Sequence, residues 1–140
     1  MTAPVPLPDF ALEVASPFVA ASGLRVDEYD GAHVRGHVDL GPTQHTPWGV
    51  VHGGAHCSIV ESAASIGGSA AVAGRGQVAV DVHNATDLIR STTGGRAEVE
   101  ALPVHQGRTQ QLWEVEIRQD GKLLARGNVR LQNVDASRVG

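Results

Sequence analysis

Hydrophobic and polar residues alternate along residues 33–40, and this alternation predicts a strand that is buried on one side. Its small and apolar residues share one face: Val34, Gly36, Val38 and Leu40. Residues 24–29 are the expected partner strand, because Asp30 and Gly31 form a turn signal between the two segments.

The second half of the chain contains four more segments that are typical of strands. They are residues 78–89, 96–105, 109–118 and 122–134. Turns that contain glycine separate them at residues 93–95, 106–108 and 119–121. Because short turns join successive strands, we expect antiparallel pairing.

Residues 53–73 lie between the two groups of strands and show no period-two pattern. Their side chains are nearly all small or apolar, which predicts a buried helix of about 30 Å. A shorter helix is expected over residues 9–21, interrupted by Pro17 and stopped by Gly23. The predicted fold class is α+β, with one long central helix wrapped by a strongly curved antiparallel sheet.

The composition fits a single domain. The chain has 140 residues and no linker-like segment, so we expect one domain over residues 1–140, with flexible tails at 1–8 and 135–140. The net charge is −4 and lysine and arginine do not cluster, which argues against a nucleic-acid partner. The single cysteine suits a reducing compartment. No secretory signal or membrane span is indicated, so we expect a cytoplasmic protein.

Residues 47–54, Pro-Trp-Gly-Val-Val-His-Gly-Gly, run directly into the predicted helix. Glycines at a helix start let a ligand reach exposed backbone N–H groups, where the helix dipole stabilises developing negative charge. The Gly53 N–H is therefore a candidate oxyanion-hole donor. The alternative is that Gly53 and Gly54 only form a tight turn.

Glu61 is the single charged residue between Gly53 and Gly74, with histidine counted as neutral. A carboxylate on an otherwise uncharged, buried helix costs free energy unless it is hydrogen-bonded or functional. Its neighbours one turn away include Cys57, Ser58 and Ser65, a small polar stripe suited to one wall of a pocket. The alternative is that Glu61 is only solvated at a wet boundary between subunits.

The spacing of these two candidates predicts a dimer. Gly53 and Glu61 are eight residues apart, so they lie about 12 Å apart along one helix and cannot both contact one reacting carbonyl. If both serve one site, Glu61 comes from a second chain whose helix runs antiparallel across a two-fold axis.

Other candidates have weaker patterns. His52 and His56 are four residues apart, but the glutamate of the zinc-protease pattern and a third ligand are missing, so we expect no metal. His52 is instead expected to orient the loop through a backbone hydrogen bond. Cys57 is interpreted as a packing residue, because Cys57 and His56 face different directions on a helix.

The run Gly49-Val50-Val51-His52-Gly53-Gly54, with Glu61 eight positions after Gly53, resembles the hotdog-fold acyl-CoA thioesterases of the phenylacetate-pathway (PaaI-like) family. The resemblance covers residues 24–133. It continues through Asn84, Gly94-Gly95, Gly107-Arg108-Thr109 and Asp120-Gly121. With Glu61 and Ser65, the sequence resembles the subgroup that contains the Arthrobacter-type 4-hydroxybenzoyl-CoA thioesterase and the dihydroxynaphthoyl-CoA hydrolase of menaquinone synthesis.

This resemblance implies a hotdog fold and a role for each candidate residue. The Gly53 N–H would polarise the thioester carbonyl, and Glu61 of a partner subunit would act as nucleophile or general base. Ser65 would contact Glu61 or the attacking water, and His52 would hold the loop. The remaining expected substrate- or CoA-binding residues are Gly54, Asn84, Arg90, Arg108 and Thr109, of which the arginines suit phosphates.

The implied activity is hydrolysis of an aryl or other hydrophobic acyl-CoA by a homodimer or homotetramer, with no cofactor beyond the coenzyme A of the substrate. Many relatives have Gln or Asn where this chain has Thr46, so either Thr46 performs a reduced form of that role or the rate and substrate differ. Two alternatives remain: a hotdog hydratase or dehydratase that uses His52 and Glu61, and a non-catalytic module that binds acyl-CoA or an acyl carrier protein.

Overall fold

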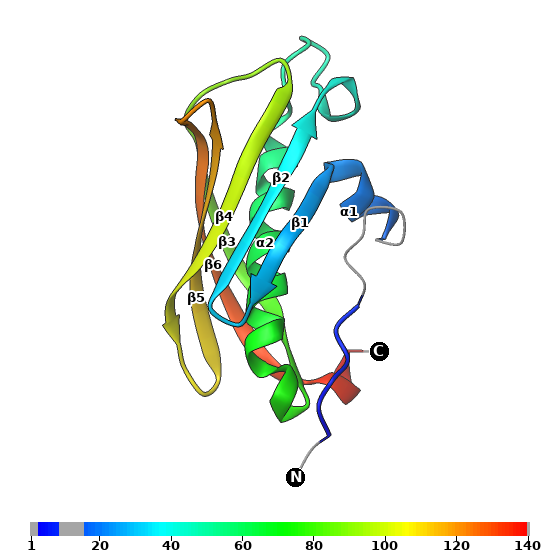
Figure 1. Cartoon of the computed structure of the whole chain (residues 1–140), viewed down its shortest axis with the longest axis vertical. Coiled ribbons are helices and arrows are strands. Elements are labelled where there is room, and N and C mark those ends of the chain that lie inside the picture. The colour runs from blue at the N-terminus through cyan, green and yellow to red at the C-terminus, as the bar shows by residue number, and fades with distance from the viewer. Residues whose placement is uncertain (1–2, 9–15, 140) are drawn as a thin grey trace.

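The protein folds as one long helix lying against the concave face of a curved sheet (Figure 1); the structure is a computed structural model that describes residues 3–8 and 16–139. The strand order is β1-β2-β4-β5-β6-β3, and each neighbouring pair is antiparallel. The strands are β1 (Leu24–Asp30), β2 (His33–Leu40), β3 (Gln77–Leu88), β4 (Gly95–Gln106), β5 (Gln110–Gln119) and β6 (Lys122–Asp135). The helices are α1 (Pro17–Ser22) and α2 (Gly53–Val72), with short 3-10 helices η1 (Pro42–Gln44), η2 (Ala73–Arg75) and η3 (Ala136–Arg138). The predicted α+β architecture is confirmed.

Glycines let the sheet approach α2 closely. A Cβ atom on Gly67 would overlap the indole of Trp113, which is completely buried. Gln111, also buried, donates from Nε2 to the Gly68 carbonyl at 3.0 Å and accepts the Trp113 Nε1–H at 2.8 Å. Because the sheet packs on the backbone of α2 here, larger side chains at these positions would force the two layers apart.

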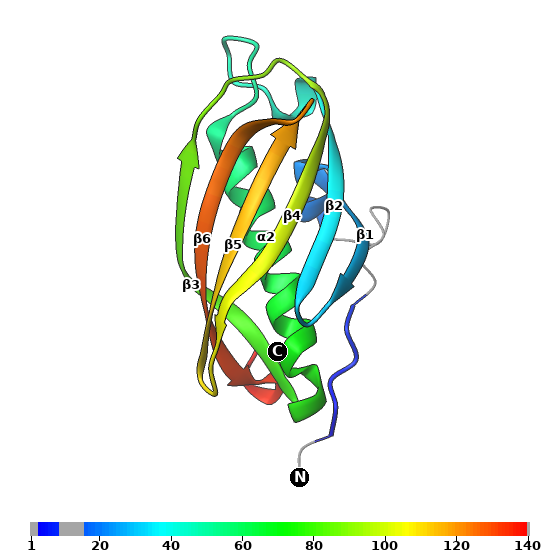
Figure 2. The ribbon, with the colours of Figure 1, turned by 60° about the vertical axis from the view of Figure 1, so that its left-hand side comes forward.

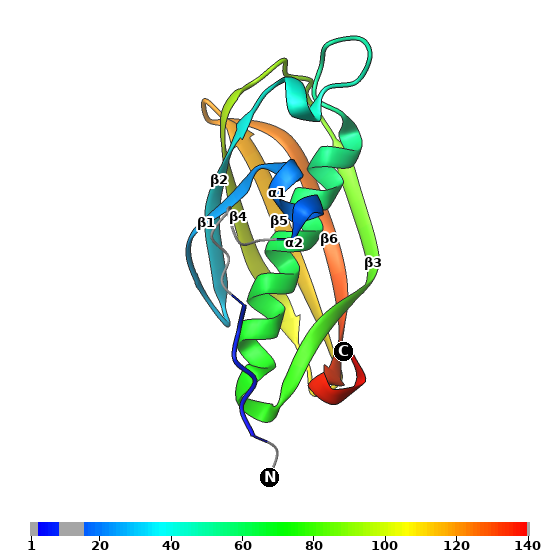
Figure 3. The same ribbon diagram turned by 90° about the vertical axis from the view of Figure 1, so that its right-hand side faces the viewer.

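The prediction that α2 is buried all round is wrong for a single chain. The sheet covers one side, which holds the buried residues His56, Ile59, Val60, Ala63, Ala64, Ile66, Gly67, Gly68 and Val72. Glu61 is exposed and Ser65 is half-buried. Figure 3 shows the reason, since α2 lies in front of the sheet and α1 crosses only part of its open side.

Among the described residues, the first helix begins at Pro17. Ser16 caps α1 by accepting the Val19 N–H at 3.2 Å. Proline suits the first turn of a helix, where its missing N–H has no acceptor to satisfy. Gly23, with φ of 82°, ends α1 as expected. The rest of the predicted pattern, residues 9–15, lies outside the described residues.

The two edges of the sheet are β1 and β3 (Figure 2). Val82 and Leu88 of β3, and Ile89 directly after it, are large apolar side chains that are more than half exposed. A long, apolar strand with one unpaired edge is a surface that a further strand can join. No helix within residues 3–8 and 16–139 is both long and apolar enough to cross a membrane.

Candidate active site

The loop that precedes α2 is held in place from both sides. The His52 N–H donates to the Gln44 carbonyl at 2.7 Å, and the Gln44 side chain donates to the Ala21 carbonyl of α1 at 3.1 Å. On the other side, His45 Nε2 donates to the Thr93 carbonyl at 2.6 Å. The start of α2 is therefore fixed between α1 and the segment that follows β3.

His52 caps α2 with its imidazole ring. Nδ1 of His52 accepts the Gly54 N–H at 2.8 Å, so this nitrogen is unprotonated and a neutral ring carries its proton on Nε2. The Gly53 N–H, by contrast, meets no acceptor within the described part of the chain. An unpaired N–H at the positive end of a 20-residue helix is placed to bind an oxyanion.

The first turn of α2 touches two hollows. The larger, about 430 Å³, lies on the α1 side and is lined by Phe18, Ala21, Ser22, Thr43, Gln44, His45, His52, Gly54, Ala55 and Ser58. The smaller, about 230 Å³, lies at the end of β3 and is lined by Val51, Gly53, His56, Leu88, Ile89, Arg90 and Ser91. A Cβ atom on Gly53 would overlap the end of the Leu88 side chain, which shows how closely the end of β3 approaches this position.

Glu61 lies two turns further along α2 and faces β3. Its pKa is raised from the ordinary value of 4.5 to about 7, first by a hydrogen bond with the carboxyl group of Asp81, then by burial and by the Asp81 charge. A hydrogen bond from Asn84 acts in the opposite direction. Asn84 also donates to the Cys57 carbonyl at 3.1 Å, which holds β3 against α2 beside Glu61. A carboxyl group with a pKa near 7 can exchange protons at neutral pH.

The structure divides the predicted site residues into separate groups. His52, Gly53, Gly54 and Arg90 gather at the start of α2. Asn84 joins Glu61, and Ser65 follows Glu61 by one turn on the same open side of the helix. Gly53 and Glu61 of one chain stay apart, because eight residues of the same helix separate them.

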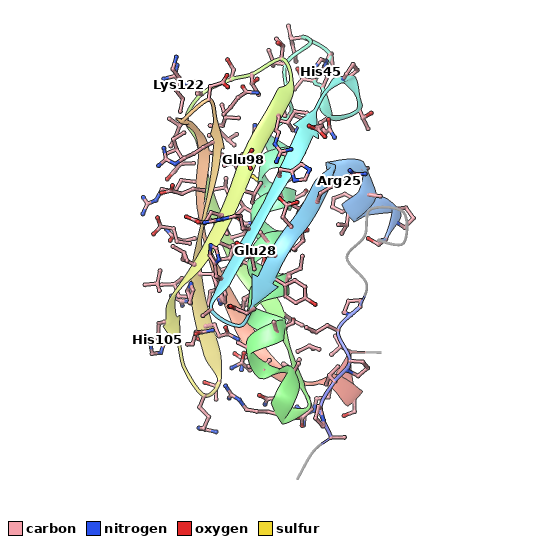
Figure 4. The ribbon with its side chains drawn as sticks, viewed as in Figure 1. Arg25, Glu28, His45, Glu98, His105 and Lys122 are labelled. Carbon is pink, nitrogen blue, oxygen red and sulfur yellow. The ribbon has the colours of Figure 1, made fainter. Side chains whose placement is uncertain are left out.

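Three predicted residues lie apart from both groups. The Thr46 hydroxyl accepts the Trp48 N–H at 3.2 Å and supports the turn over residues 46–50. Arg108 and Thr109 are in the β4–β5 turn, beside His105, at the opposite end of the molecule from the loop that carries His45 (Figure 4). They can serve the same ligand as Arg90 only if a second copy presents them.

Sequence reasoning missed Asp81 as the partner of Glu61. The strand pattern of residues 78–89 could not show which way Asp81 points, because a β-bulge shifts the register between Asp81 and His83. Leu88 was missed as well. Its contact with Gly53 joins the end of β3 to the start of α2, and no local pattern reports a contact of that kind.

Comparison with known proteins identifies the family. A profile of the thioesterase superfamily matches residues 49–125, more than half of the chain. The chain belongs to the thioesterase superfamily. The matched region contains the start of α2, Glu61 and the whole of β3, so this thioesterase carries both groups of candidate residues within the family's own domain.

The thioesterase is similar to Mycobacterium tuberculosis protein Rv1847, which is named provisionally as an esterase: the two are 41% identical over 128 residues, which cover 89% of this chain and 91% of that protein. The solved structure of that protein matches this structure with a TM-score of 0.82, and the match covers 86% of this chain and 98% of that chain. S. sahachiroi AziG also has a TM-score of 0.82, at 38% identity and with the same coverage. The 1,4-dihydroxy-2-naphthoyl-CoA hydrolase of Escherichia coli is 35% identical over 71 residues, covering 51% of this chain and 52% of that enzyme. These likenesses confirm the predicted hotdog fold and the predicted class of enzyme, a thioester hydrolase; the Arthrobacter-type subgroup stays a prediction.

Proposed function

We propose that this thioesterase hydrolyses acyl-CoA esters with an aryl or other hydrophobic acyl group, and that the Gly53 N–H binds the thioester oxygen. The observation that carries the proposal is the unpaired Gly53 N–H at the start of α2. Gly53 lines the smaller hollow, and its neighbours His52 and Gly54 line the larger one. Negative charge develops on the thioester oxygen as a nucleophile adds, so a preorganised donor at that point lowers the barrier.

The two hollows suit the two halves of such a substrate. Phe18, Ala21 and Ala55 give the larger hollow an apolar wall for the acyl group. Arg90 and Ser91 line the smaller hollow, where a guanidinium suits the phosphates of coenzyme A. In this arrangement the thioester carbonyl lies at Gly53, between the two halves.

The carboxylate of the reaction is assigned to Glu61 of a second copy. Along one helix Gly53 and Glu61 are separated by about 12 Å, too far to share a carbonyl. Glu61 faces β3, whose outer edge is unpaired and exposes Val82 and Leu88. Pairing of two β3 edges about a two-fold axis would bury these side chains, extend the sheet and bring each Glu61 toward the other chain's Gly53.

A pKa near 7 favours general-base chemistry for Glu61. In this mechanism the carboxylate takes a proton from water as the water oxygen bonds to the thioester carbon. The oxyanion forms against the Gly53 N–H, the carbon–sulfur bond then breaks, and the thiolate takes the proton from Glu61. Ser65, one turn away, is assigned a hydrogen bond to Glu61 or to this water.

Thiol release from a panel of aryl, short-chain and long-chain CoA esters tests the activity. We expect Glu61→Gln and Glu61→Ala to lower kcat by about 10²- to 10⁴-fold, the usual contribution of a general base. Glu98→Gln is the matched control, because Glu98 is paired with Arg96 on the outer face of the sheet. Unchanged turnover in both Glu61 variants would refute the assignment.

Mixed dimers test whether the site is shared. An equal mixture of Glu61→Gln and Gly53→Pro chains, refolded or co-expressed, forms mixed dimers that each hold one intact pair of Gly53 and Glu61. Proline is used because it has no backbone N–H and suits the first position of a helix. If the pair spans two chains, the mixture recovers up to about one quarter of wild-type activity from two inactive variants. If both groups act within one chain, no activity returns.

A further inference from the structure

His56 is a buried histidine that the proposed mechanism does not use. Its side chain is 4% exposed, and Nδ1 is shielded from solvent with no hydrogen-bond partner. Nε2 also forms no hydrogen bond with residues 3–8 and 16–139, but it is not shielded in the same way. Burial lowers the pKa of the ring, so His56 is neutral at pH 7, with one nitrogen that donates and one that accepts. Nδ1 is closed to a ligand as well as to water, so Nε2 is the nitrogen that a partner from outside the chain can reach.

The hollow at the end of β3 is where such a partner can enter. His56 lines this hollow together with Arg90 and with Gly53, the proposed oxyanion donor. Val51, Leu88 and Ile89 make the remaining wall mostly apolar. His56 lies three residues after Gly53, which places it one helical turn, about 4.5 Å, along α2 from the Gly53 N–H.

We propose that His56 binds the first amide group of the substrate's thiol arm, a role that rests on the proposed acyl-CoA hydrolysis. In coenzyme A two methylene groups separate the thioester sulfur from this amide, a length comparable with one helical turn. A secondary amide has one N–H donor and one carbonyl acceptor that point in opposite directions, so it forms one hydrogen bond with His56 Nε2, which accepts or donates according to the tautomer of the neutral ring. His56 is thus a positioning residue: it holds the arm, while Gly53 and Glu61 act on the reacting carbonyl.

The alternative occupant of this hollow is the acyl group. Two observations favour the thiol arm. Arg90 gives the hollow a positive charge that a hydrophobic acyl group cannot use, whereas the arm continues to phosphates. The larger hollow has the greater volume and the Phe18, Ala21 and Ala55 wall, so it is better suited to the acyl group.

The test uses three thioesters of one acyl group: the CoA ester, the N-acetylcysteamine ester, which keeps the first amide, and an S-butyl ester, which has none. The quantity measured is the kcat/KM of each amide-bearing ester divided by the kcat/KM of the S-butyl ester. We expect His56→Ala to lower both ratios by about 10- to 100-fold, mainly through KM. His56→Asn, which restores one donor and one acceptor, should recover part of the loss, and His56→Leu, which fills the space without polar atoms, should not.

His33→Ala, on the outer face of β2, is the control and should leave both ratios unchanged. Unchanged ratios in His56→Ala and His56→Leu would overturn the inference, and so would an equal loss with all three esters, which indicates a structural role. A larger loss with the S-butyl ester would place the acyl group beside His56 and also overturn it. If the wild-type protein hydrolyses none of the three, the proposed function itself is refuted, and this inference with it.

Discussion

Replacing Asp81 with asparagine should move the acid limb of the pH–rate profile to lower pH. Asp81 raises the pKa of Glu61 through a hydrogen bond and through its charge, and the hydrogen bond is the largest cause. Asparagine keeps the shape of the side chain and removes the charge. Because Glu61 must be ionised to take a proton from water, a lower pKa makes it active at lower pH.

The expected size follows from the two pKa values. With a pKa of about 7, Glu61 is about 10% ionised at pH 6 and about 90% ionised at pH 8. If the variant brings the pKa back toward the ordinary 4.5, ionisation at pH 6 becomes nearly complete. The activity at pH 6 relative to that at pH 8 should therefore rise by about 5- to 10-fold.

The assay measures kcat/KM by thiol release between pH 5 and pH 9 at constant ionic strength. Asp87→Asn is the matched control, because it makes the same change in charge on the same strand, where Asp87 acts on Arg126. An acid limb that stays near pH 7 in Asp81→Asn, or that moves equally in both variants, would refute the coupling of Asp81 to Glu61.

Two further predictions concern stability. Gly67→Ala should lower the free energy of unfolding by about 1–3 kcal/mol, because the added methyl group overlaps Trp113, whereas Gly74→Ala, with open space around it, should change it by less than about 0.5 kcal/mol; urea denaturation measures both. His52→Ala removes the cap on the Gly54 N–H, so we expect a loss of about 0.5–2 kcal/mol together with a lower kcat. An unchanged urea midpoint in Gly67→Ala would contradict the close packing of α2 against Trp113. An unchanged kcat in His52→Ala would contradict the role of His52 in holding the start of α2.

Much of the fold could be predicted from local patterns. Alternation over residues 33–40 gave a strand with those bounds, and α2 begins at Gly53 as the run of glycines indicated. The small residues of α2 anticipated the close sheet, which the contact of Gly67 with Trp113 confirms. Local patterns failed on the open side of α2: residues that looked fully buried face outward in one chain, because the sheet covers only one side of the helix.

By itself, the sequence determined which segments form strands and helices, where α2 begins, and that Gly53 and Glu61 of one chain cannot share a carbonyl. These properties depend on neighbouring residues and on fixed helical geometry. Only the tertiary structure decided that Asp81 meets Glu61 and that Nδ1 of His56 is buried without a partner among the described residues. The contact of Glu61 with Asp81 joins α2 to β3, and a one-residue shift at the bulge in β3 would have turned the strand's side chains to the other face.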